Sequence, residues 1–264
     1  MTFLSQTYPS PRFSSFRAIF ALILREMTTT YGRSPGGYIW AVVEPVAGIA
    51  VFAVVFGYIF DSPPLGSSFA LFFATGLLPL MLYQNVAGKV GMAIKFSMPL
   101  LAYPRVKYTD TIIARWLLTV LTYILVTVII VAGLIAFEDI DVSLDFIAIG
   151  MALLMAGLLG LGVGLFNSFM MSMFPIYQTV WAVVNRPMFI VSGVLYLIDP
   201  LPVFYRDLLL LNPICHVVMK MREGVFVVYD AVYVSTTYVF FFAGAPAVIG
   251  LILLHRYHND ILEN

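Results

Sequence analysis

The sequence is poor in charged residues and has almost no cysteine. Only 11% of its 264 residues are charged, whereas 61% are apolar. A soluble domain of this length needs about a quarter of its residues charged to cover its surface, so the composition excludes that class. The formal net charge is zero, which gives no electrostatic basis for binding nucleic acid. The single cysteine, Cys215, cannot form an intrachain disulfide, and the three histidines are too scattered to predict a metal site.

Motifs for nucleotide chemistry are also missing. The chain has no phosphate-binding loop of the form G-x-x-x-x-G-K-S/T, and its nearest fragment, 88–90, lacks both the glycine cradle and the magnesium-binding hydroxyl. Carboxylates gather only at 138–145, where a solvated loop explains them. We therefore predict that the chain is not an enzyme and holds no cofactor. If transport is active, the energy comes from another subunit or from an ion gradient.

Long apolar stretches dominate what is present. A helix needs about 20 predominantly apolar residues to cross the hydrocarbon core of a membrane. Only the break at 173–175 separates the fourth and fifth stretches, and we read it as a tight turn because proline ends or kinks a helix. The sequence predicts an all-α polytopic membrane protein, a single domain over 1–264 with six transmembrane helices. The six stretches are 38–60, 69–87, 111–137, 146–171, 178–198 and 232–254.

The basic residues predict the orientation of these helices. With the N-terminus inside, the inner segments carry nine Lys or Arg residues and the outer segments carry three. Cytoplasmic loops carry the excess of positive charge, so we expect both termini in the cytoplasm. Residues 1–37 contain no compact apolar stretch followed by a small-residue cleavage site, so the first span is expected to be retained.

Three segments lie outside the predicted spans. Residues 13–33 place apolar side chains at helical spacing, as in an amphipathic helix that lies in the membrane interface. A plain N-terminal anchor is the alternative. Residues 88–110 form a long, basic cytoplasmic loop. Residues 199–230 are apolar for an outer loop, and we expect two half-helices there, 201–212 and 213–224, dipping into the outer interface.

Few ionisable residues fall within the spans. Glu44 and Arg186 lie inside the first and fifth stretches, and Arg115 lies near an inner boundary. Intramembrane charges commonly mark a substrate path, although Glu44 is also explained by pairing with an arginine, and Arg186 by snorkelling to the headgroups. Amphipathic aromatics form the interfacial belt or pack against sugar rings. The aromatic candidates for a substrate path are Trp40, Tyr83, Trp116, Tyr123, Trp181 and Tyr196.

Four blocks of sequence form a recognisable set. They are Leu24-Arg25-Glu26-Met27-Thr28-Thr29 continuing through Tyr31-Gly32-Arg33, Gly37-Tyr38-Ile39-Trp40 and Glu44-Pro45; Pro104 with Asp110-Thr111-Ile112-Ile113-Ala114-Arg115; Met173-Phe174-Pro175 with Arg186-Pro187; and Leu211-Asn212-Pro213-Ile214-Cys215-His216-Val217-Val218 with Arg222-Glu223. These blocks resemble the permeases of type-2 ABC exporters, and most closely those that export capsular polysaccharide. They occur in the family's order and cover nearly the whole chain.

The resemblance implies a role for each segment outside the spans. The helix at 13–33 would rest against a nucleotide-binding subunit, the loop 88–110 would contain the coupling helix, and 199–230 would hold the periplasmic gate helices. The implied ATPase contacts are Arg25, Glu26, Lys95, Arg105 and Lys107. The implied gate residues are Asn212, Pro213, His216, Arg222 and Glu223.

The resemblance also implies an assembly in the bacterial inner membrane. It would contain a homodimer of this chain and two ATP-binding subunits, which would hold ATP and Mg²⁺. A lipid-linked capsular polysaccharide would pass to a periplasmic co-polymerase and an outer-membrane exporter. The alternatives are export of another lipid-linked glycan (O-antigen, teichoic acid) or of a small molecule. A membrane-embedded transferase and an ion-coupled carrier are weaker alternatives, because the chain lacks clustered catalytic groups and an evident repeat.

Overall fold

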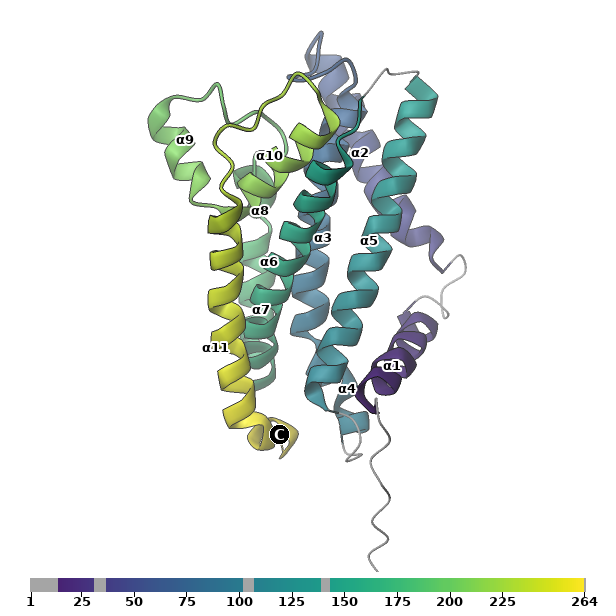
Figure 1. The fold of residues 1–264 in the computed structure, drawn as a ribbon, viewed down its shortest axis with the longest axis vertical. Coiled ribbons are helices and arrows are strands. Elements are labelled where there is room, and N and C mark those ends of the chain that lie inside the picture. The colour runs from purple at the N-terminus through teal and green to yellow at the C-terminus, as the bar shows by residue number, and fades with distance from the viewer. Residues whose placement is uncertain (1–13, 31–36, 102–106, 139–142, 264) are drawn as a thin grey trace, which may run out of the picture.

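The computed structural model describes residues 14–30, 37–101, 107–138 and 143–263, and every regular element in these ranges is a helix (Figure 1). Five helices are long and apolar enough to cross a membrane: α2 (Ile39–Ile59), α3 (Phe69–Gly91), α5 (Tyr108–Glu138), α6 (Phe146–Met173) and α11 (Thr236–Glu263). The shorter helices are α1 (Ser14–Thr30), α4 (Ala93–Leu101), α7 (Pro175–Asn185), α8 (Met188–Val191), α9 (Val203–Leu210) and α10 (Pro213–Val225).

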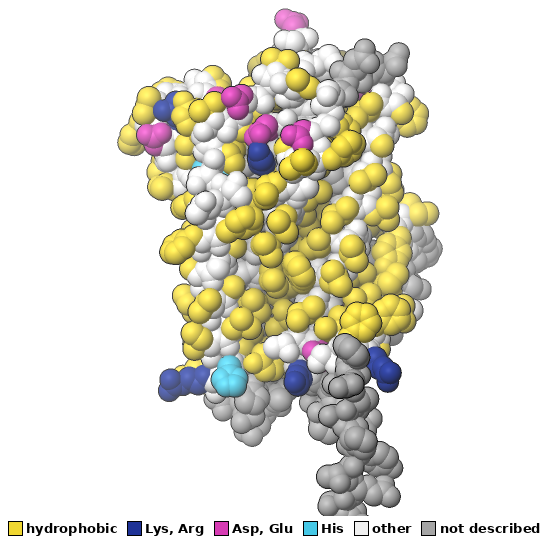
Figure 2. All heavy atoms as spheres, in the orientation of Figure 1, with side chains coloured by type: hydrophobic (Ala, Val, Ile, Leu, Met, Phe, Trp, Pro, Cys, Tyr) yellow, Lys and Arg dark blue, Asp and Glu magenta, His cyan; other side chains and the backbone are white. Residues whose placement is uncertain are grey.

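Four of the short helices, α1, α4, α9 and α10, lie at the two ends of the bundle, whereas α7 and α8 lie along it (Figure 1). We call one end the α4 end, where α1, α4 and the last turns of α11 lie, and the other the α10 end, where α9 and α10 lie. Figure 2 shows an apolar band between these ends, with basic side chains along the α4 end and most of the visible acidic ones at the α10 end. This is the surface of a protein that places its apolar band in lipid.

Side-chain caps fix where two of the long helices begin. Ser68 Oγ accepts a hydrogen bond from Leu71 N at 3.0 Å at the start of α3. Asp145 Oδ1 accepts from Ile147 N and Ala148 N at 2.8 and 3.1 Å at the start of α6. Each cap satisfies backbone donors that the first helical turn leaves without partners. Asp145 N also donates to Gly224 O at 2.8 Å, which ties the start of α6 to α10.

Helix α3 is the centre of the bundle. Within its most apolar stretch 72% of the residues are buried, against 11% in α2. Helix α6 approaches α3 through glycines: a Cβ added at Gly160 would lie 2.7 Å from Val86 Cβ. On the opposite face of α6, a Cβ at Gly162 would collide with the carbonyl of Ala243 in α11. These two glycines therefore allow α6 to approach α3 and α11 closely.

Five of the six predicted spans coincide with long helices, but 178–198 is not one continuous helix. The helix that begins at Pro175 ends at Asn185, and a four-residue helix, α8, follows the break at Arg186-Pro187. Pro187 has no N–H to continue the hydrogen-bond ladder, and its ring clashes with the preceding turn. The turn predicted near Pro175 is present, with Pro175 as the first residue of α7.

The segments that were predicted to lie outside the spans contain helices. Helix α3 continues through Gly91, and α4 occupies much of the predicted loop 88–110. Two short helices, α9 and α10, stand where 201–212 and 213–224 were predicted. In α10 most residues are buried, so this helix packs into the bundle.

Candidate functional site

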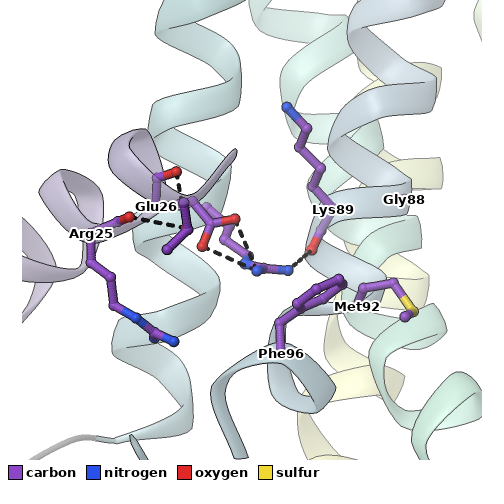
Figure 3. Close-up of a pocket in the computed structure, with 8 residues that line it drawn as sticks. Arg25, Glu26, Gly88, Lys89, Met92 and Phe96 are labelled. Atoms are coloured by element: carbon purple, nitrogen blue, oxygen red, sulfur yellow. Dashed lines mark hydrogen bonds and ion pairs between the residues drawn. The ribbon is translucent and has the colours of Figure 1, made fainter. Parts of the chain in front are cut away.

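A partly enclosed cavity of about 610 Å³ lies at the α4 end, between α1 and the bundle. We call it the α1 cavity (Figure 3). Three of its lining residues are basic and one is acidic. The lining residues are Arg25, Glu26, Thr29, Gly88, Lys89, Met92, Phe96 and Arg115.

Arg115 joins three elements at this cavity. Its Nη2 lies 2.9 Å from Glu26 Oε1 and donates to Glu26 Oε2 at 3.1 Å, which ties α5 to α1. Its Nη1 donates to Lys89 O at 3.4 Å, near the end of α3. The guanidinium also lies over the Phe96 ring of α4, 4.6 Å from its centroid. Arg115 is only 7% exposed, and its Nε has no hydrogen-bond partner among the described residues.

Helix α1 presents an apolar ridge away from the bundle. Phe16, Phe20 and Leu24 are spaced one turn apart and are 69%, 56% and 48% exposed. This ridge lies at the helical spacing on which the amphipathic helix was predicted. Arg25, beside Leu24, is exposed, while Glu26 points to Arg115. The pairing of Glu26 with Arg115 across 89 residues is the part of this site that sequence reasoning missed.

A second buried cluster lies at the α10 end, around Arg222. This side chain is fully buried, donates to Tyr196 O at 2.9 Å and Val194 O at 3.0 Å, and lies 4.2 Å from the centroid of the Phe72 ring. Burial lowers the pKa of Arg222 to about 10, a value that keeps it charged at neutral pH. Arg222 therefore fixes the segment between α8 and α9 against α10 and α3.

Tyr229 and Cys215, which lie beside this cluster, form further hydrogen bonds. Tyr229 donates to Asp199 at 2.5 Å, and burial followed by this hydrogen bond raises the pKa of Tyr229. Cys215, the only cysteine in the sequence, is buried and its thiol donates to Val191 O at 3.2 Å. Burial raises the pKa of Cys215 to about 12, so the thiol is not a reactive thiolate.

The other predicted gate residues lie in or beside α10. Asn212 caps α10, since its Oδ1 accepts from Ile214 N at 3.1 Å, and Pro213 follows at the first helical position. His216 accepts from Ser235 N at Nδ1 (3.2 Å), so its Nε2–H donates to Leu210 O (2.9 Å). Burial lowers its pKa. Glu223 pairs with Lys220 at 2.7 Å. Together these contacts connect α9, α10 and the start of α11.

The two charges predicted within the first and fifth spans lie on the outside of this chain. Glu44 is exposed on α2, and Arg186 is exposed at the break between α7 and α8. Among the described residues no ion pair joins them. Helix α7 is fastened to the bundle by polar contacts: Tyr177 OH donates to Asn167 Oδ1 at 2.9 Å, and Gln84 Nε2 lies 3.5 Å from Asn185 O.

The aromatic path candidates fall into two groups. Tyr83 and Tyr123 are buried, and half-buried Trp116 donates to Gly157 O at 3.0 Å, so these three pack within the chain. Trp40 is 59% exposed on α2. Trp181 on α7 is half-buried, as is Tyr196, whose hydroxyl donates to Ile190 O at 3.1 Å. The structure therefore leaves Trp40 and Arg186 exposed and Trp181 half-buried against the core.

The predicted ATPase contacts are spread over the α4 end. Lys95 is half-buried on α4, and Lys107 is exposed just before α5. Arg105 lies outside the described residues. Arg25 and Glu26 line the α1 cavity. Among the described residues no three potential metal ligands are grouped to hold an ion.

Comparison with known proteins identifies the family. The model of the ABC-2 type transporter family matches residues 17–226. The chain is 32% identical to the polysialic acid transport protein KpsM of Escherichia coli over 245 residues, which cover 92% of this chain and 95% of KpsM. It is 26% identical to the capsule polysaccharide export inner-membrane protein CtrC of Neisseria meningitidis serogroup A, over 93% of this chain and 92% of CtrC. It is 24% identical to the capsule polysaccharide export inner-membrane protein BexB of Haemophilus influenzae, over 93% of this chain and 92% of BexB. The chain belongs to the ABC-2 type transporter family.

Proposed function

We propose that this chain is the inner-membrane permease subunit of an ATP-driven exporter of capsular polysaccharide. The observation that carries the proposal is its similarity, over more than nine-tenths of its length, to the polysialic acid transport protein KpsM and to the capsule polysaccharide export proteins CtrC and BexB. The apolar band and the family membership agree with a permease. ATP hydrolysis, with its Mg²⁺, would take place in a separate subunit.

If α7 and α8 together form one broken transmembrane span, the chain crosses the membrane six times. Helix α6 runs from Asp145, which contacts α10, to the α4 end, and α11 runs in the same direction (Figure 1). The chain between them has to return across the bundle, and α7 and α8 are the helices in that stretch. Broken helices are tolerated at membrane depth where the freed backbone groups lie against protein or a water-filled path.

The orientation in the membrane follows from charge. The α4 end carries the basic side chains seen in Figure 2 and would face the cytoplasm. Since α1 and the end of α11 both lie at the α4 end, both termini would be cytoplasmic. Cysteine-accessibility labelling on a Cys215→Ser background tests this. Single cysteines at 62–68 and 226–232 should be labelled in intact cells with an opened outer membrane, and a cysteine at Lys107 only after permeabilisation.

A homodimer would cover the exposed polar residues of α2 and α7. Glu44 and Arg186 are exposed on helices otherwise rich in exposed apolar side chains, and a charge facing lipid costs about 2.5–3.5 kcal/mol at mid-bilayer. A second copy facing these helices across a hydrated path would remove that cost. A polysaccharide on a lipid anchor would then meet Arg186 and the aromatic rings of Trp40 and Trp181.

The α4 end would bind two ATPase subunits in the dimer. Helix α4 would be the coupling helix, with α1 beside it, because both are short helices at the end proposed to face the cytoplasm. The α9 and α10 helices would form the periplasmic gate, next to a periplasmic co-polymerase and an outer-membrane exporter. Charge reversal at Lys95 together with Arg105 should uncouple ATP hydrolysis from export, and normal export from this double variant would contradict the role of α4.

The experiment that tests the function is deletion of the gene in its own host, followed by complementation. The deletion strain should lose surface polysaccharide and accumulate the same polymer on its lipid anchor inside the cell. The intact gene should reverse both changes. A deletion strain with normal surface polymer, or one that accumulates a different glycan, would refute capsule export.

A further inference from the structure

We propose that a polar stripe on α3, formed by Gln84, Asn85 and Lys89, lines the substrate path, where its two amides bind sugar hydroxyls of the exported polymer. The inference rests on the proposed function and deepens it, since it names side chains that a hydroxyl-rich polymer would touch. None of these three residues was among the path candidates expected from the sequence.

Burial and helical spacing define the stripe. Every residue of α3 from Leu71 to Leu80 is buried. Beyond Leu80 the half-buried positions recur three and four residues apart, which places them on one face of the helix. These positions are Met81, Gln84, Asn85, Gly88 and Lys89. The stripe therefore runs along the half of α3 that is nearer the α4 end.

The stripe is open at the α4 end. Gly88 and Lys89 also line the α1 cavity, so the stripe continues into that cavity. Side chains on a helix point toward its N-terminus, and Figure 3 shows the Lys89 side chain extending away from Met92 and Phe96. Its ammonium group is therefore directed back along α3, the direction in which Asn85 follows on the same face.

The two amides lie at membrane depth. Gln84 follows Phe69, the first residue of α3, by 15 positions, which is about 22 Å at ~1.5 Å per residue. With Phe69 at one boundary of a hydrocarbon core about 30 Å thick, Gln84 and Asn85 lie inside the core and Lys89 lies at the far boundary. Snorkelling to the headgroups would explain Lys89, but the amide side chains are too short for it.

The chain satisfies the amides only in part. Asn85 Nδ2 donates to Met81 O at 3.0 Å, and Gln84 Nε2 donates to Asn185 O at a long 3.5 Å. Among the described residues these two side chains make no other hydrogen bond, so both amide oxygens remain able to accept one. An amide left facing hydrocarbon in this state is costly, which favours a face in contact with water or with sugar hydroxyls.

Helix α7 supplies an aromatic side to the stripe. Tyr177, Trp181 and Asn185 follow one another at intervals of four residues and are half-buried, so they share the face that meets the bundle. The contact of Asn185 O with Gln84 places this face beside the stripe. Trp181 lies one turn from Asn185, and sugar rings pack against indole rings while amides exchange hydrogen bonds with sugar hydroxyls.

Thiol accessibility tests whether the stripe is hydrated, and it does not depend on the identity of the polymer. Gln84→Cys and Asn85→Cys, each on a Cys215→Ser background, should react with the cationic methanethiosulfonate reagent MTSET. The complete transporter is used in inside-out vesicles, where the α4 end would face the medium. Leu125→Cys, which is exposed on the apolar surface of α5, should not react. Two unreactive stripe positions would show that the stripe is packed against protein or lipid, and would overturn the proposal.

Export assays test whether the polymer touches the amides. The double variant Gln84→Leu with Asn85→Leu removes both amides at similar volume. It should lower export about ten-fold, equivalent to ~1.4 kcal/mol, with normal abundance and ATPase association. Asn85→Gln keeps an amide and should export more than Asn85→Leu. Thr75→Val is the control, because Thr75 lies on the buried half of α3 and its hydroxyl donates to Phe72 O.

The outcomes separate this inference from the proposed function. Normal surface polymer in the deletion strain would refute capsule export itself. Wild-type export by the double leucine variant, in a host whose deletion strain does lose the polymer, would refute only the role of the stripe. A double leucine variant of low abundance, together with cysteines that do not react with MTSET, would make the amides structural and would also overturn the proposal.

Discussion

Glu26 and Arg115 meet at the boundary between α1 and α5, with Arg115 Nη2 2.9 Å from Glu26 Oε1. Their side chains are 20% and 8% exposed, so this is a largely buried ion pair. It fastens the amphipathic helix to the transmembrane bundle at the α4 end.

Removing one partner of this pair should destabilise the protein. Arg115 would remain buried and unpaired in Glu26→Gln, at a cost of about 3 kcal/mol, the lower limit for a broken buried pair. We expect a lower melting temperature by fluorescence-detected size-exclusion chromatography. The swapped variant, Glu26→Arg with Arg115→Glu, should recover part of the loss. A Glu26→Gln protein as stable as wild type would mean that the pair does not fasten α1.

Arg222 should be essential for the structure of the α10 end. Arg222→Gln removes two charge-assisted hydrogen bonds to the carbonyls of Val194 and Tyr196, each worth about 1.5–3 kcal/mol. Arg222→Lys should not restore stability, because an ammonium cannot reproduce the planar fork stacked on Phe72. The matched control is Lys220→Gln on the same helix, whose ion pair with Glu223 is partly exposed. Equal melting temperatures for the two glutamine variants would contradict this role.

His216 should make stability depend on pH. Its pKa is lowered in the folded protein by burial, so the unfolded chain takes up a proton first as the pH falls. The stabilisation from neutral His216 is fully present above about pH 6.5, the ordinary value, and is lost as the pH falls toward the lower folded pKa. Wild type should therefore melt at lower temperature at pH 5 than at pH 7.5. His216→Gln should lose part of this difference, and an unchanged difference would remove His216 as its cause.

Gly162 and Gly150 lie on the same helix, α6, but differ in the space around them, so their alanine variants can be compared. Gly162→Ala places a Cβ against the Ala243 backbone of α11, and overpacking of this kind costs about 1–3 kcal/mol. Gly150 is exposed with open space around it, so Gly150→Ala should be neutral or stabilise the helix by up to ~1 kcal/mol. Melting temperatures of the two variants give the test. Equal tolerance of both alanines would show that α6 and α11 can separate at no cost.

Arg186 gives the test of the proposed path. Arg186→Gln should leave abundance and ATPase association normal, since the side chain is exposed. It should lower export about ten-fold, the ratio equivalent to ~1.4 kcal/mol of barrier. Arg186→Lys should restore export in part, because passage needs weak, exchangeable contacts. Arg256→Gln at the α4 end is the control. Wild-type export by Arg186→Gln would make the residue structural.

Composition and apolar periodicity were sufficient to predict the helical class and five long spans. The fifth stretch was expected to be one continuous helix because apolar composition continues through Arg186-Pro187, but the backbone cannot continue its hydrogen bonds there and the helix is broken. The motif at Asn212-Pro213 located the start of α10 correctly, because it pairs a capping side chain with a proline at the first helical position.

The tertiary pairings could not be predicted. Glu26 and Arg115 were each singled out for a separate role, and nothing in a single sequence indicates that residues so far apart form an ion pair. Arg222 was singled out only as a gate residue in an outer segment, although it is fully buried. The available signal was the apolar run around it in 213–225, which is unusual for a solvated helix.

The central position of α3 affects how the protein is made. Of the five long helices α3 has the lowest mean hydropathy, 1.4 against 2.1–2.8 for the others, and it is also the most buried. It emerges from the ribosome before α6 and α11 exist to cover the bundle. During that interval the polar side chains of Gln84, Asn85 and Lys89 lack their later neighbours and face lipid or the insertion machinery. During biogenesis there is therefore a stage at which α3, the least apolar of the five long helices, has been synthesised and the helices that bury it have not. A chain truncated before α6 should be degraded in the cell.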